Sequence, residues 1–228
     1  MKERHLEVRR LGLLDYGKGL ELQKELETRV IEERLTDYLL LLEHPHTYTL
    51  GRRAKTDGVL ATKELLESMG VSVFEINRGG KVTYHGIGQI VGYPIVSLSP
   101  DREDVHRYVR DLEETLILTL GDFGIDAFRI KGLTGVHTSE GKVAAIGVHI
   151  KRWVTTHGFA LNVNTDLSYY DWIISCEGEP VVSMEKLLGR EIELPEVEDS
   201  IIRNFAEVFG VGETVVADLA KAGTPAAG

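Results

Sequence analysis

The clearest strand pattern in the chain is GKVAAIGVHIKRWVTTHGFALNV, residues 141–163. Successive side chains of a strand point to opposite faces, so residues at every second position share a face. The pair Lys151-Arg152 predicts a short turn, after which Trp153 to Val163 returns beside the first strand. The first strand carries on one face Lys142, Ala144, Ile146, Val148 and Ile150.

Outward from this strand pair, helical and extended patterns alternate. Asp15 and Ser183 are plausible N-caps, and Gly70 and Gly121 are stop signals. Helices are expected over residues 15–35, 62–69, 101–120, 183–188 and a last amphipathic segment with Ile201, Ile202, Phe205 and Phe209. The third helix has a stripe made of Val105, Val109, Leu112 and Leu116. Strands are expected over residues 38–43, 47–50, 71–76, 82–85 and 90–98.

Intermingled strands and helices without an internal repeat predict one α+β (mixed α/β) domain. The chain has 228 residues, enough for one large domain. We assign residues 1–212 to this domain. From about Thr214 the sequence is poor in large apolar residues, so residues 213–228 are expected to form a mobile tail.

Composition excludes several classes of protein. The net charge of −10 disfavours a general nucleic-acid binder, because phosphate binding needs clustered Lys and Arg. The most apolar short run, Leu39 to Leu42, lies between Asp37 and Glu43 and is too short to span a bilayer. The first ten residues mix charged and apolar groups, so no apolar secretory leader is expected. We therefore expect a cytoplasmic protein with no membrane partner.

The densest polar segment is RGGKVTYHGIGQ, residues 78–89. Its four glycines allow a backbone to approach a phosphate or a thin extended chain closely. A glycine-rich hairpin with a bulge explains the same pattern. No Gly-Lys-Ser/Thr follows at the spacing of the phosphate-binding loop, and the segment lacks the glycine spacing of the dinucleotide fingerprint, so no nucleotide site is indicated.

A second candidate site combines Lys142 with Cys176, the only cysteine in the chain. A thiol and an amine that meet in a partly dry pocket favour thiolate with ammonium, which gives a nucleophile with its own proton carrier. The alternatives are a small buried cysteine and a strand-edge lysine. A papain-like protease would instead combine Cys176 with His157 and Asn162, but the sequence around the cysteine lacks that family's signature. The pair His44 and His46 is interpreted as structural, and no metal site is predicted.

Four separated motifs resemble those of the lipoyl (octanoyl) transferases. They are Arg78-Gly79-Gly80 through Gln89, Gly141 to Gly147, Thr156 to Val163, and Cys176. Glu43-His44-Pro45 and Thr49 to Arg52 also match that family. The resemblance covers most of the chain and implies the biotin and lipoate protein ligase fold, with a central mixed sheet and flanking helices.

The resemblance implies that an octanoyl or lipoyl group moves from acyl carrier protein to a lysine of lipoyl domains through a thioester on Cys176. Lys142 would be the general acid and base. It implies no cofactor, because a thioester donor makes ATP unnecessary. Substrate contacts are implied for Arg78, Gly79, Gly80, Lys81, Val82, Thr83, Tyr84, His85, Ala145, Ile146, Gly147, Gly158, Phe159 and Ala160.

The implied partners are octanoyl carrier protein as donor and, as acceptors, the lipoyl domains of 2-oxoacid dehydrogenases and the glycine cleavage H protein. These partners are acidic by the same resemblance, so local basic residues should steer them. We expect this role for Arg52, Arg53, Lys55, Arg78, Lys81, Lys151 and Arg152. Two alternatives remain: an ATP-dependent lipoate protein ligase of the same fold, and a non-catalytic module that binds lipoyl domains.

Overall fold

The computed structural model describes residues 5–33, 36–54, 58–174 and 180–219 of the chain. Within these residues the strands form a seven-stranded sheet, ordered β10-β1-β2-β6-β9-β8-β7, and a three-stranded sheet, ordered β4-β3-β5. The strands are β1 (His5–Leu13), β2 (Thr36–Glu43), β3 (Thr47–Leu50), β4 (Ser72–Glu75), β5 (Val82–His85), β6 (Gln89–Ile95), β7 (Val136–Thr138), β8 (Gly141–Lys151), β9 (Val154–Asn162) and β10 (Glu213–Asp218).

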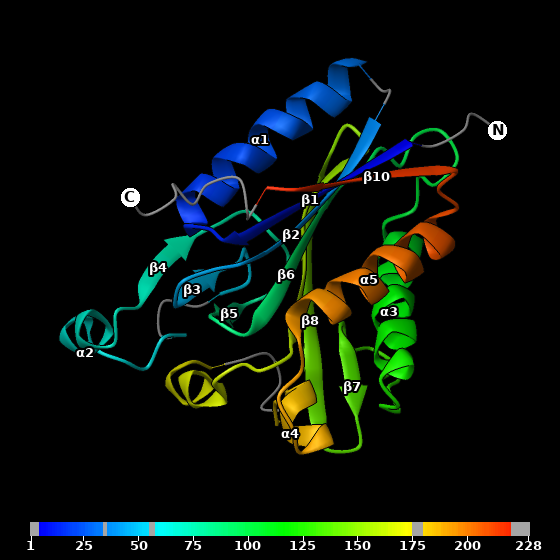
Figure 1. Cartoon of the computed structure of the whole chain (residues 1–228). Helices are drawn as coiled ribbons and strands as arrows, with labels where there is room; N and C mark the ends of the chain where they lie inside the picture. Colours follow the sequence, from blue (N-terminus) through cyan, green and yellow to red (C-terminus); the bar gives the residue numbers. More distant parts are fainter. Residues whose placement is uncertain (1–4, 34–35, 55–57, 175–179, 220–228) are drawn as a thin grey trace, which may run out of the picture.

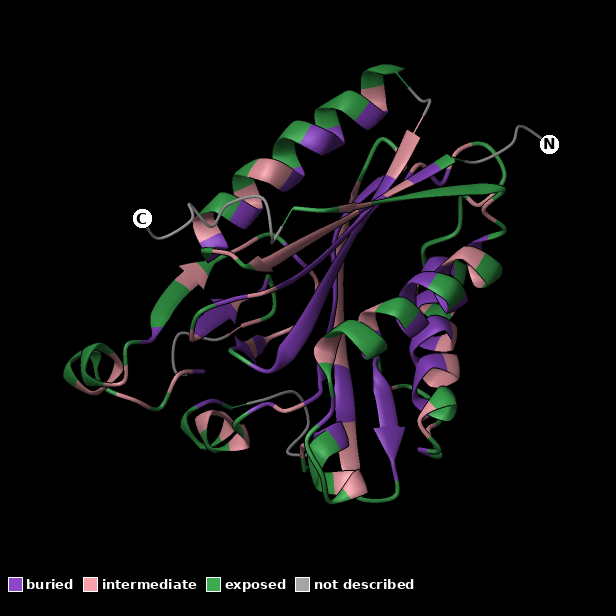
Figure 2. Cartoon of the chain, viewed as in Figure 1, coloured by how far each residue is buried: buried purple, intermediate pink, exposed green. Residues whose placement is uncertain are grey.

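Helices cover both faces of the large sheet (Figure 1). Helix α1 lies on one face, and α3 and α5 lie together on the other. The helices are α1 (Tyr16–Glu33), α2 (Lys63–Ser68), α3 (Val105–Asp122), α4 (Met184–Leu188) and α5 (Leu194–Phe209), and a 3-10 turn covers Leu167–Trp172. Buried residues lie in the centre of the sheet and on the helix faces turned toward it (Figure 2).

The run Leu39 to Leu42 forms the centre of β2. Leu39 and Leu41 pack in the core under α3 and α5, whereas Leu40 and Leu42 pack in the core under α1. A strand that is covered on both faces needs apolar residues at every position, which explains the unbroken leucine run.

The sheet is mixed, as expected. Strand β1 pairs in parallel with both β2 and β10, while the pairs β2/β6, β6/β9, β8/β9 and β7/β8 are antiparallel. The prediction of an α+β fold with a central mixed sheet and flanking helices is therefore confirmed.

The predicted strand pair exists as β8 and β9, but its turn lies one residue later than expected. Lys151 pairs with Val154, and the two residues between them, Arg152 and Trp153, have φ values of 51° and 63°. Positive φ at both positions is the conformation of the type I′ turn, whose twist matches that of the flanking strands, and this accounts for the left-handed pair.

Helix α3 differs from its prediction at both ends. It begins at Val105 and not at residue 101, because the Asp104 carboxylate caps it by accepting hydrogen bonds from the backbone N–H groups of His106 and Arg107. Gly121 lies inside the helix, and the chain turns at Gly124, where φ is +75°. The left-handed conformation that ends a helix is supplied by the later glycine.

Part of the expected tail belongs to the sheet. Residues 213–218 form β10, which pairs with β1 from His5 to Arg10. The side chains of β10 are mostly exposed, so burial of apolar side chains does not explain why this strand forms. Its main-chain pairing with β1 does. The division of the chain at residue 212 remains a prediction, and residues 220–228 lie outside the described part.

None of the helices described in the structure combines the length and the apolar character that crossing a bilayer requires.

Candidate active site

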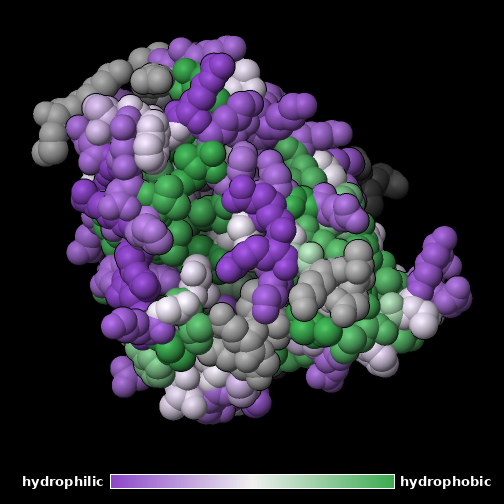
Figure 3. Space-filling view, turned by 180° about the vertical axis from the view of Figure 1, so that it is seen from behind, coloured by the Kyte–Doolittle hydropathy of each residue, from purple (hydrophilic) through white to green (hydrophobic). Residues whose placement is uncertain are grey.

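A cavity of about 400 Å³ opens beside β8 and β9, within the range typical of small-molecule sites. Its lining comes from these two strands, the segment 78–83, residues 52 and 53, and the first turns of α3. The reverse face of the molecule shows hydrophobic residues on both sides of a group of hydrophilic residues that crosses its centre, with further hydrophilic residues toward the edge (Figure 3). Apolar surface bordered by polar residues is typical of ligand-binding and interaction sites.

Glycines allow the segment 78–80 to lie directly on β8. Gly147 pairs with Gly158 of β9, and the N–H of Gly79 donates to the carbonyl of Val148 at 3.0 Å. A Cβ atom at position 147 would lie 2.9 Å from the carbonyl oxygen of Gly79. The close approach of two backbones at the cavity therefore requires glycine here.

A second loop holds the segment 78–81 in place. The N–H groups of Gly51, Arg52 and Arg53 donate to the carbonyls of Lys81, Arg78 and Gly80 at 2.9, 3.1 and 3.0 Å. A Cβ at Gly51 would lie 2.6 Å from the Gly80 oxygen, so this contact also needs glycine. These three backbone hydrogen bonds bring the exposed side chains of Arg52 and Arg53 to the cavity.

Arg78 has a different environment from the one expected of a docking residue. Its side chain is buried, and its guanidinium donates to the backbone oxygen and hydroxyl of Thr49, both at 2.8 Å, and to the carbonyl of Gly79. Arg78 therefore lines the cavity and supports the loop from within. Of the other expected steering residues, Lys151 lies 3.8 Å from the carboxylate of Glu27, and Lys55 lies outside the described residues.

Buried histidines stand near the inner wall of the cavity without adding charge. The Nδ1–H of His44 donates to the carbonyl of Leu14, and its Nε2 accepts from the hydroxyl of Tyr93. Burial lowers the pKa of His44 to about 4 and that of His157 to about 3, and it lowers the pKa of His85 well below the usual value. These rings are therefore neutral at pH 7.

A chain of hydrogen bonds joins β5 to the segment after residue 180. The Nδ1–H of His85 donates to the Gln89 amide oxygen, and the Gln89 amide donates to Asn162 at 2.9 Å. Asn162 in turn donates to the carbonyl of Val182 at 3.2 Å. The N–H of Val182 donates to the carbonyl of Lys142 at 3.0 Å, so the chain of hydrogen bonds reaches the backbone of Lys142.

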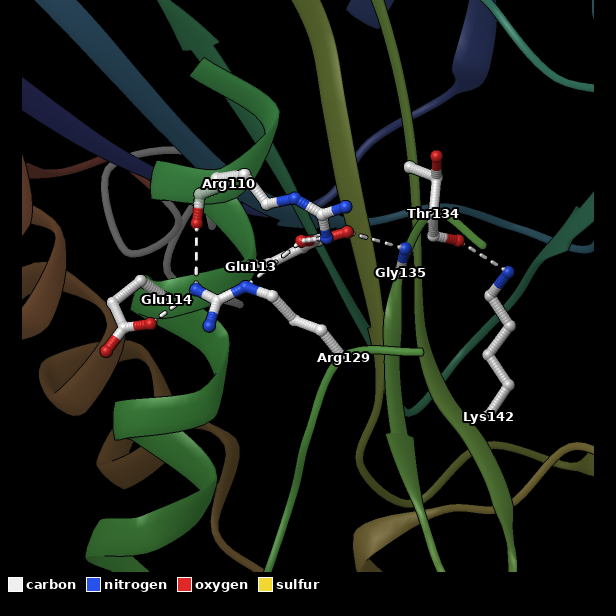
Figure 4. A network of polar contacts seen from close by, with 7 residues as sticks. All are labelled: Arg110, Glu113, Glu114, Arg129, Thr134, Gly135 and Lys142. Carbon is white, nitrogen blue, oxygen red and sulfur yellow. Dashed lines mark hydrogen bonds and ion pairs between the residues drawn. The ribbon is translucent and has the colours of Figure 1, made fainter. Parts of the chain in front are cut away.

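Lys142 lines the cavity and is held by its backbone and by its amine. Its N–H donates to the carbonyl of Pro180, and its carbonyl accepts from the N–H of Val182. Its Nζ donates to the carbonyl of Thr134 at 2.8 Å (Figure 4). Cys176 lies outside the described residues, so the Lys142–Cys176 pair remains a prediction.

All the described residues that were expected to contact substrate line the cavity except Tyr84. Tyr84 is fully buried, stacks on Tyr169 and shares a hydrogen bond with His46. In β5, Thr83 and His85 line the cavity while Tyr84 between them does not. Tyr84 therefore lies outside the lining of the cavity, because successive residues of a strand point to opposite faces, and its contact with substrate remains a prediction.

Other lining residues were not predicted for the site. The stripe residues Val105 and Val109 line the cavity, and Val105 is 43% exposed, whereas Leu112 and Leu116 are in the core. Helical spacing alone cannot separate a core stripe from a cavity wall. The remaining unpredicted lining residues are Tyr16, Tyr93, Gly132, Thr134, Ala144, Val148, His157, Asn162, Tyr170 and Val181.

Neither a papain-like protease nor a metal site matches the hydrogen-bond partners of the histidines. His157 donates from Nε2 to Asn77 and from its backbone to Gln23, while Asn162 is engaged by Gln89 and Val182. His44 and His46 bond to different groups. In the described ranges, no group of three or more His, Cys, Asp or Glu side chains is arranged to hold a metal ion.

The buried histidines predict a stability that falls with acid. Their pKa values are lower in the folded chain than the usual value of about 6.5, so the unfolded chain binds more protons below pH 6.5. Between pH 7 and 5, each should lower the free energy of unfolding by up to about 1.4 kcal/mol per pH unit. Chemical denaturation across this range measures the slope.

His44→Gln should reduce that slope, and His106→Gln, at an exposed position, is the control. Equal slopes for wild type and His44→Gln would contradict the assignment.

The chain has the fold of lipoate protein ligases, with a large mixed sheet and flanking helices. A lipoate-protein ligase A bound with ATP has a TM-score of 0.74 at 17% identity, covering 97% of this chain and 92% of the other. Protein Ta0514 of T. acidophilum, a putative lipoate protein ligase with bound lipoic acid, has a TM-score of 0.73 at 17% identity and the same coverage. At this identity the likeness establishes the fold.

Sequence comparison identifies the family of the chain within this fold. Residues 15–206 match the family described as lipoyl protein ligase A/B catalytic domain, and the chain belongs to this family. It is 50% identical to an octanoyltransferase of Solibacter usitatus, over 94% of this chain and 98% of the relative. It is 47% identical to an octanoyltransferase of Caldicellulosiruptor saccharolyticus, over 90% and 89%. The family predicted from the motifs is confirmed.

Proposed function

We propose that the chain moves an octanoyl, or lipoyl, group from acyl carrier protein to the target lysine of lipoyl domains, through a thioester on Cys176. Relatives at 47–50% identity that are octanoyltransferases support octanoyl transfer in protein lipoylation. The observation that carries the proposal is the lysine amine of Lys142 in a glycine-lined cavity formed by the motifs that define the family. The cytoplasm is the proposed location.

In the first half of the reaction, the amine of Lys142 takes the proton of the Cys176 thiol. The thiolate attacks the carbonyl carbon of the donor thioester, a new C–S bond forms, and the carrier's C–S bond breaks. The leaving thiolate then takes the proton from the Lys142 ammonium. One thioester replaces another, so the step needs no ATP.

In the second half, the amine of the acceptor lysine attacks the acyl-Cys176 thioester. A C–N bond forms, the C–S bond breaks, and the proton lost by the amine returns through Lys142 to the cysteine sulfur. The product is an amide, which is more stable than the thioester.

The sequence positions support the meeting of these two groups. The backbone of Lys142 is hydrogen-bonded to Pro180, which follows Cys176 by four positions. Four residues span at most about 14 Å when fully extended. The chain length therefore allows the sulfur to reach the amine.

Two acyl donors, octanoyl carrier protein and free octanoate with ATP, distinguish the proposed transferase from a ligase and from a non-catalytic binding module. Intact mass after incubation with octanoyl carrier protein should show one added octanoyl group, and adding a lipoyl domain should remove it. Free octanoate with ATP should give neither an adduct nor an octanoylated lipoyl domain. Transfer that requires ATP and free acid would assign the chain to the ligases, and binding of the lipoyl domain without any adduct would make it a non-catalytic module.

The basic residues at the cavity predict a salt-dependent encounter with an acidic carrier protein. Arg52→Glu combined with Arg53→Glu should raise KM for octanoyl carrier protein about tenfold at low salt, and the difference should shrink as salt screens the charges. Steady-state transfer at two ionic strengths measures this.

The control is Lys18→Glu combined with Lys24→Glu, which makes the same charge change at exposed positions of α1. An equal rise in KM for both pairs would show a net-charge effect and no docking role for the arginines.

A further inference from the structure

A buried carboxylate on α3 contacts the segment that precedes β7. The side chain of Glu113 is fully buried, and its Oε1 accepts a hydrogen bond from the backbone N–H of Gly135 at 3.1 Å. Its Oε2 pairs with Arg110 at 2.5 Å and with Arg129 at 3.2 Å (Figure 4). Arg129 also pairs with Glu114.

This arrangement fixes the position of the Glu113 carboxylate. A buried carboxylate is costly unless it is paired and hydrogen-bonded, and here both oxygens have partners. Arg129 donates to the backbone carbonyl of Arg110 at 3.0 Å, which ties its guanidinium to the helix. The Glu113 carboxylate is therefore a fixed acceptor for the N–H of Gly135.

The same segment touches the side chain of Lys142 from the other side. The carbonyl of Thr134 accepts the hydrogen bond of the Lys142 amine at 2.8 Å. Gly135 has φ +124°, and a Cβ atom there would lie 2.6 Å from Cε and 3.2 Å from Nζ of Lys142. The backbone of residues 134 and 135 therefore orients the Lys142 amine and also limits the space available to the end of this side chain.

A single peptide group links these two contacts. The carbonyl of Thr134 and the N–H of Gly135 belong to one planar peptide bond, in which they point in opposite directions. Glu113 accepts from one end of the plane and Lys142 donates to the other. An anionic acceptor at the N–H also polarises the peptide and strengthens its carbonyl as an acceptor.

We propose that Glu113, held by Arg110 and Arg129, is the positioning residue for the Lys142 amine. The inference rests on the proposed function, in which Lys142 carries the proton between thiol and substrate. A lysine side chain loses rotamer entropy when it is fixed in one position, so a fixed carbonyl partner preorganises it for proton transfer. Glu113 acts through the peptide plane and touches no substrate.

Glu113→Ala removes the acceptor, so the peptide plane and the lysine amine lose their fixed position. We expect kcat for transfer from octanoyl carrier protein to fall about 10- to 100-fold, with KM within about twofold. The pH profile of Cys176 alkylation by iodoacetamide should move to higher pH, because a displaced ammonium stabilises the thiolate less. Glu113→Gln keeps an amide oxygen for the N–H of Gly135 and should retain more of kcat.

The matched control is Asp111→Asn, which removes another arginine-paired carboxylate of α3 that pairs with Arg102. It should leave kcat and the alkylation profile unchanged. Arg129→Gln is the second variant, because its side chain is 30% exposed and less critical for folding. Thermal unfolding of every variant identifies loss of fold.

Wild-type kcat and alkylation profile in folded Glu113→Ala overturn the inference, as does a rise in KM alone, which would indicate substrate binding. If both Glu113 variants unfold, Arg129→Gln decides by the same two measurements. If wild type transfers no octanoyl group, the proposed function fails, while the alkylation profiles still decide whether Glu113 controls the lysine. Wild-type transfer with unchanged variants rejects the inference alone.

Discussion

Cys176→Ala is expected to abolish the acyl-enzyme and to lower octanoyl transfer on the order of 10⁴-fold or more, the effect of losing a nucleophile. The chain has only this cysteine, so no other thiol can form the thioester. Intact mass after incubation with octanoyl carrier protein should show the unmodified chain. Transfer to a lipoyl domain, followed by the mass of that domain, measures the remaining rate.

The affinity of the variant for octanoyl carrier protein distinguishes loss of the nucleophile from loss of the binding site. Cys176→Ala should bind octanoyl carrier protein with about the wild-type affinity, because the variant keeps all the described residues that line the cavity. An octanoyl adduct that persists in this variant would move the nucleophile to another residue. Wild-type rates of transfer without an adduct would replace the two-step reaction by direct attack of the acceptor lysine on the donor thioester.

Lys142→Met is expected to lower the rate of acyl-enzyme formation about 10²- to 10⁴-fold, the range of general acid and base catalysis. Methionine fills a similar length of cavity wall but neither accepts a proton nor stabilises a thiolate. Rapid-quench measurement of the octanoyl adduct gives the rate of the first step. The pH profile of Cys176 alkylation should shift to higher pH in the same variant.

Lys142→Arg separates charge from proton transfer. A guanidinium keeps the positive charge but does not release its proton in proteins. Alkylation of the thiol should therefore stay close to wild type, while transfer falls nearly as far as in Lys142→Met. Lys186→Met, at an exposed position of α4, is the control. Full transfer activity in Lys142→Arg would show that the positive charge alone suffices.

The combined variant tests whether the two residues act as a unit. Groups that act on the same step are strongly non-additive, so Cys176→Ala with Lys142→Met should be no slower than Cys176→Ala alone. A further large loss in the double variant would assign Lys142 a role in a step that does not involve the thiol.

Local sequence patterns predicted most of the helices and strands, because each of these elements depends on residues that are close together in the chain. The run from Tyr38 to Glu43 indicated the strand β2, and the alternation from Lys142 to Ile150 indicated β8. Ser183 caps α4 as predicted, since its hydroxyl accepts the N–H of Lys186. Capping, periodicity and turn chemistry are interactions among residues a few positions apart, so the sequence contains them directly.

The failures of prediction share a different cause. Strand β10 forms because the edge of β1, more than 200 positions away in the sequence, offers hydrogen-bonding groups to Glu213 through Asp218. Val105 and Val109 continue the apolar stripe of α3 but face the cavity. In both cases the partner decides the outcome, and no local pattern identifies the partner.

The sequence by itself predicted most of the strands and helices and the family, because motifs and periodicity are carried by adjacent residues, and the pairing of Lys142 with Cys176 remains its prediction. Only the tertiary structure decided which motif residues share the cavity, why Tyr84 is excluded from it and how Glu113 reaches Lys142 through one peptide plane. Those relations join segments from different elements, and their geometry exists only once the sheet and α3 have packed together.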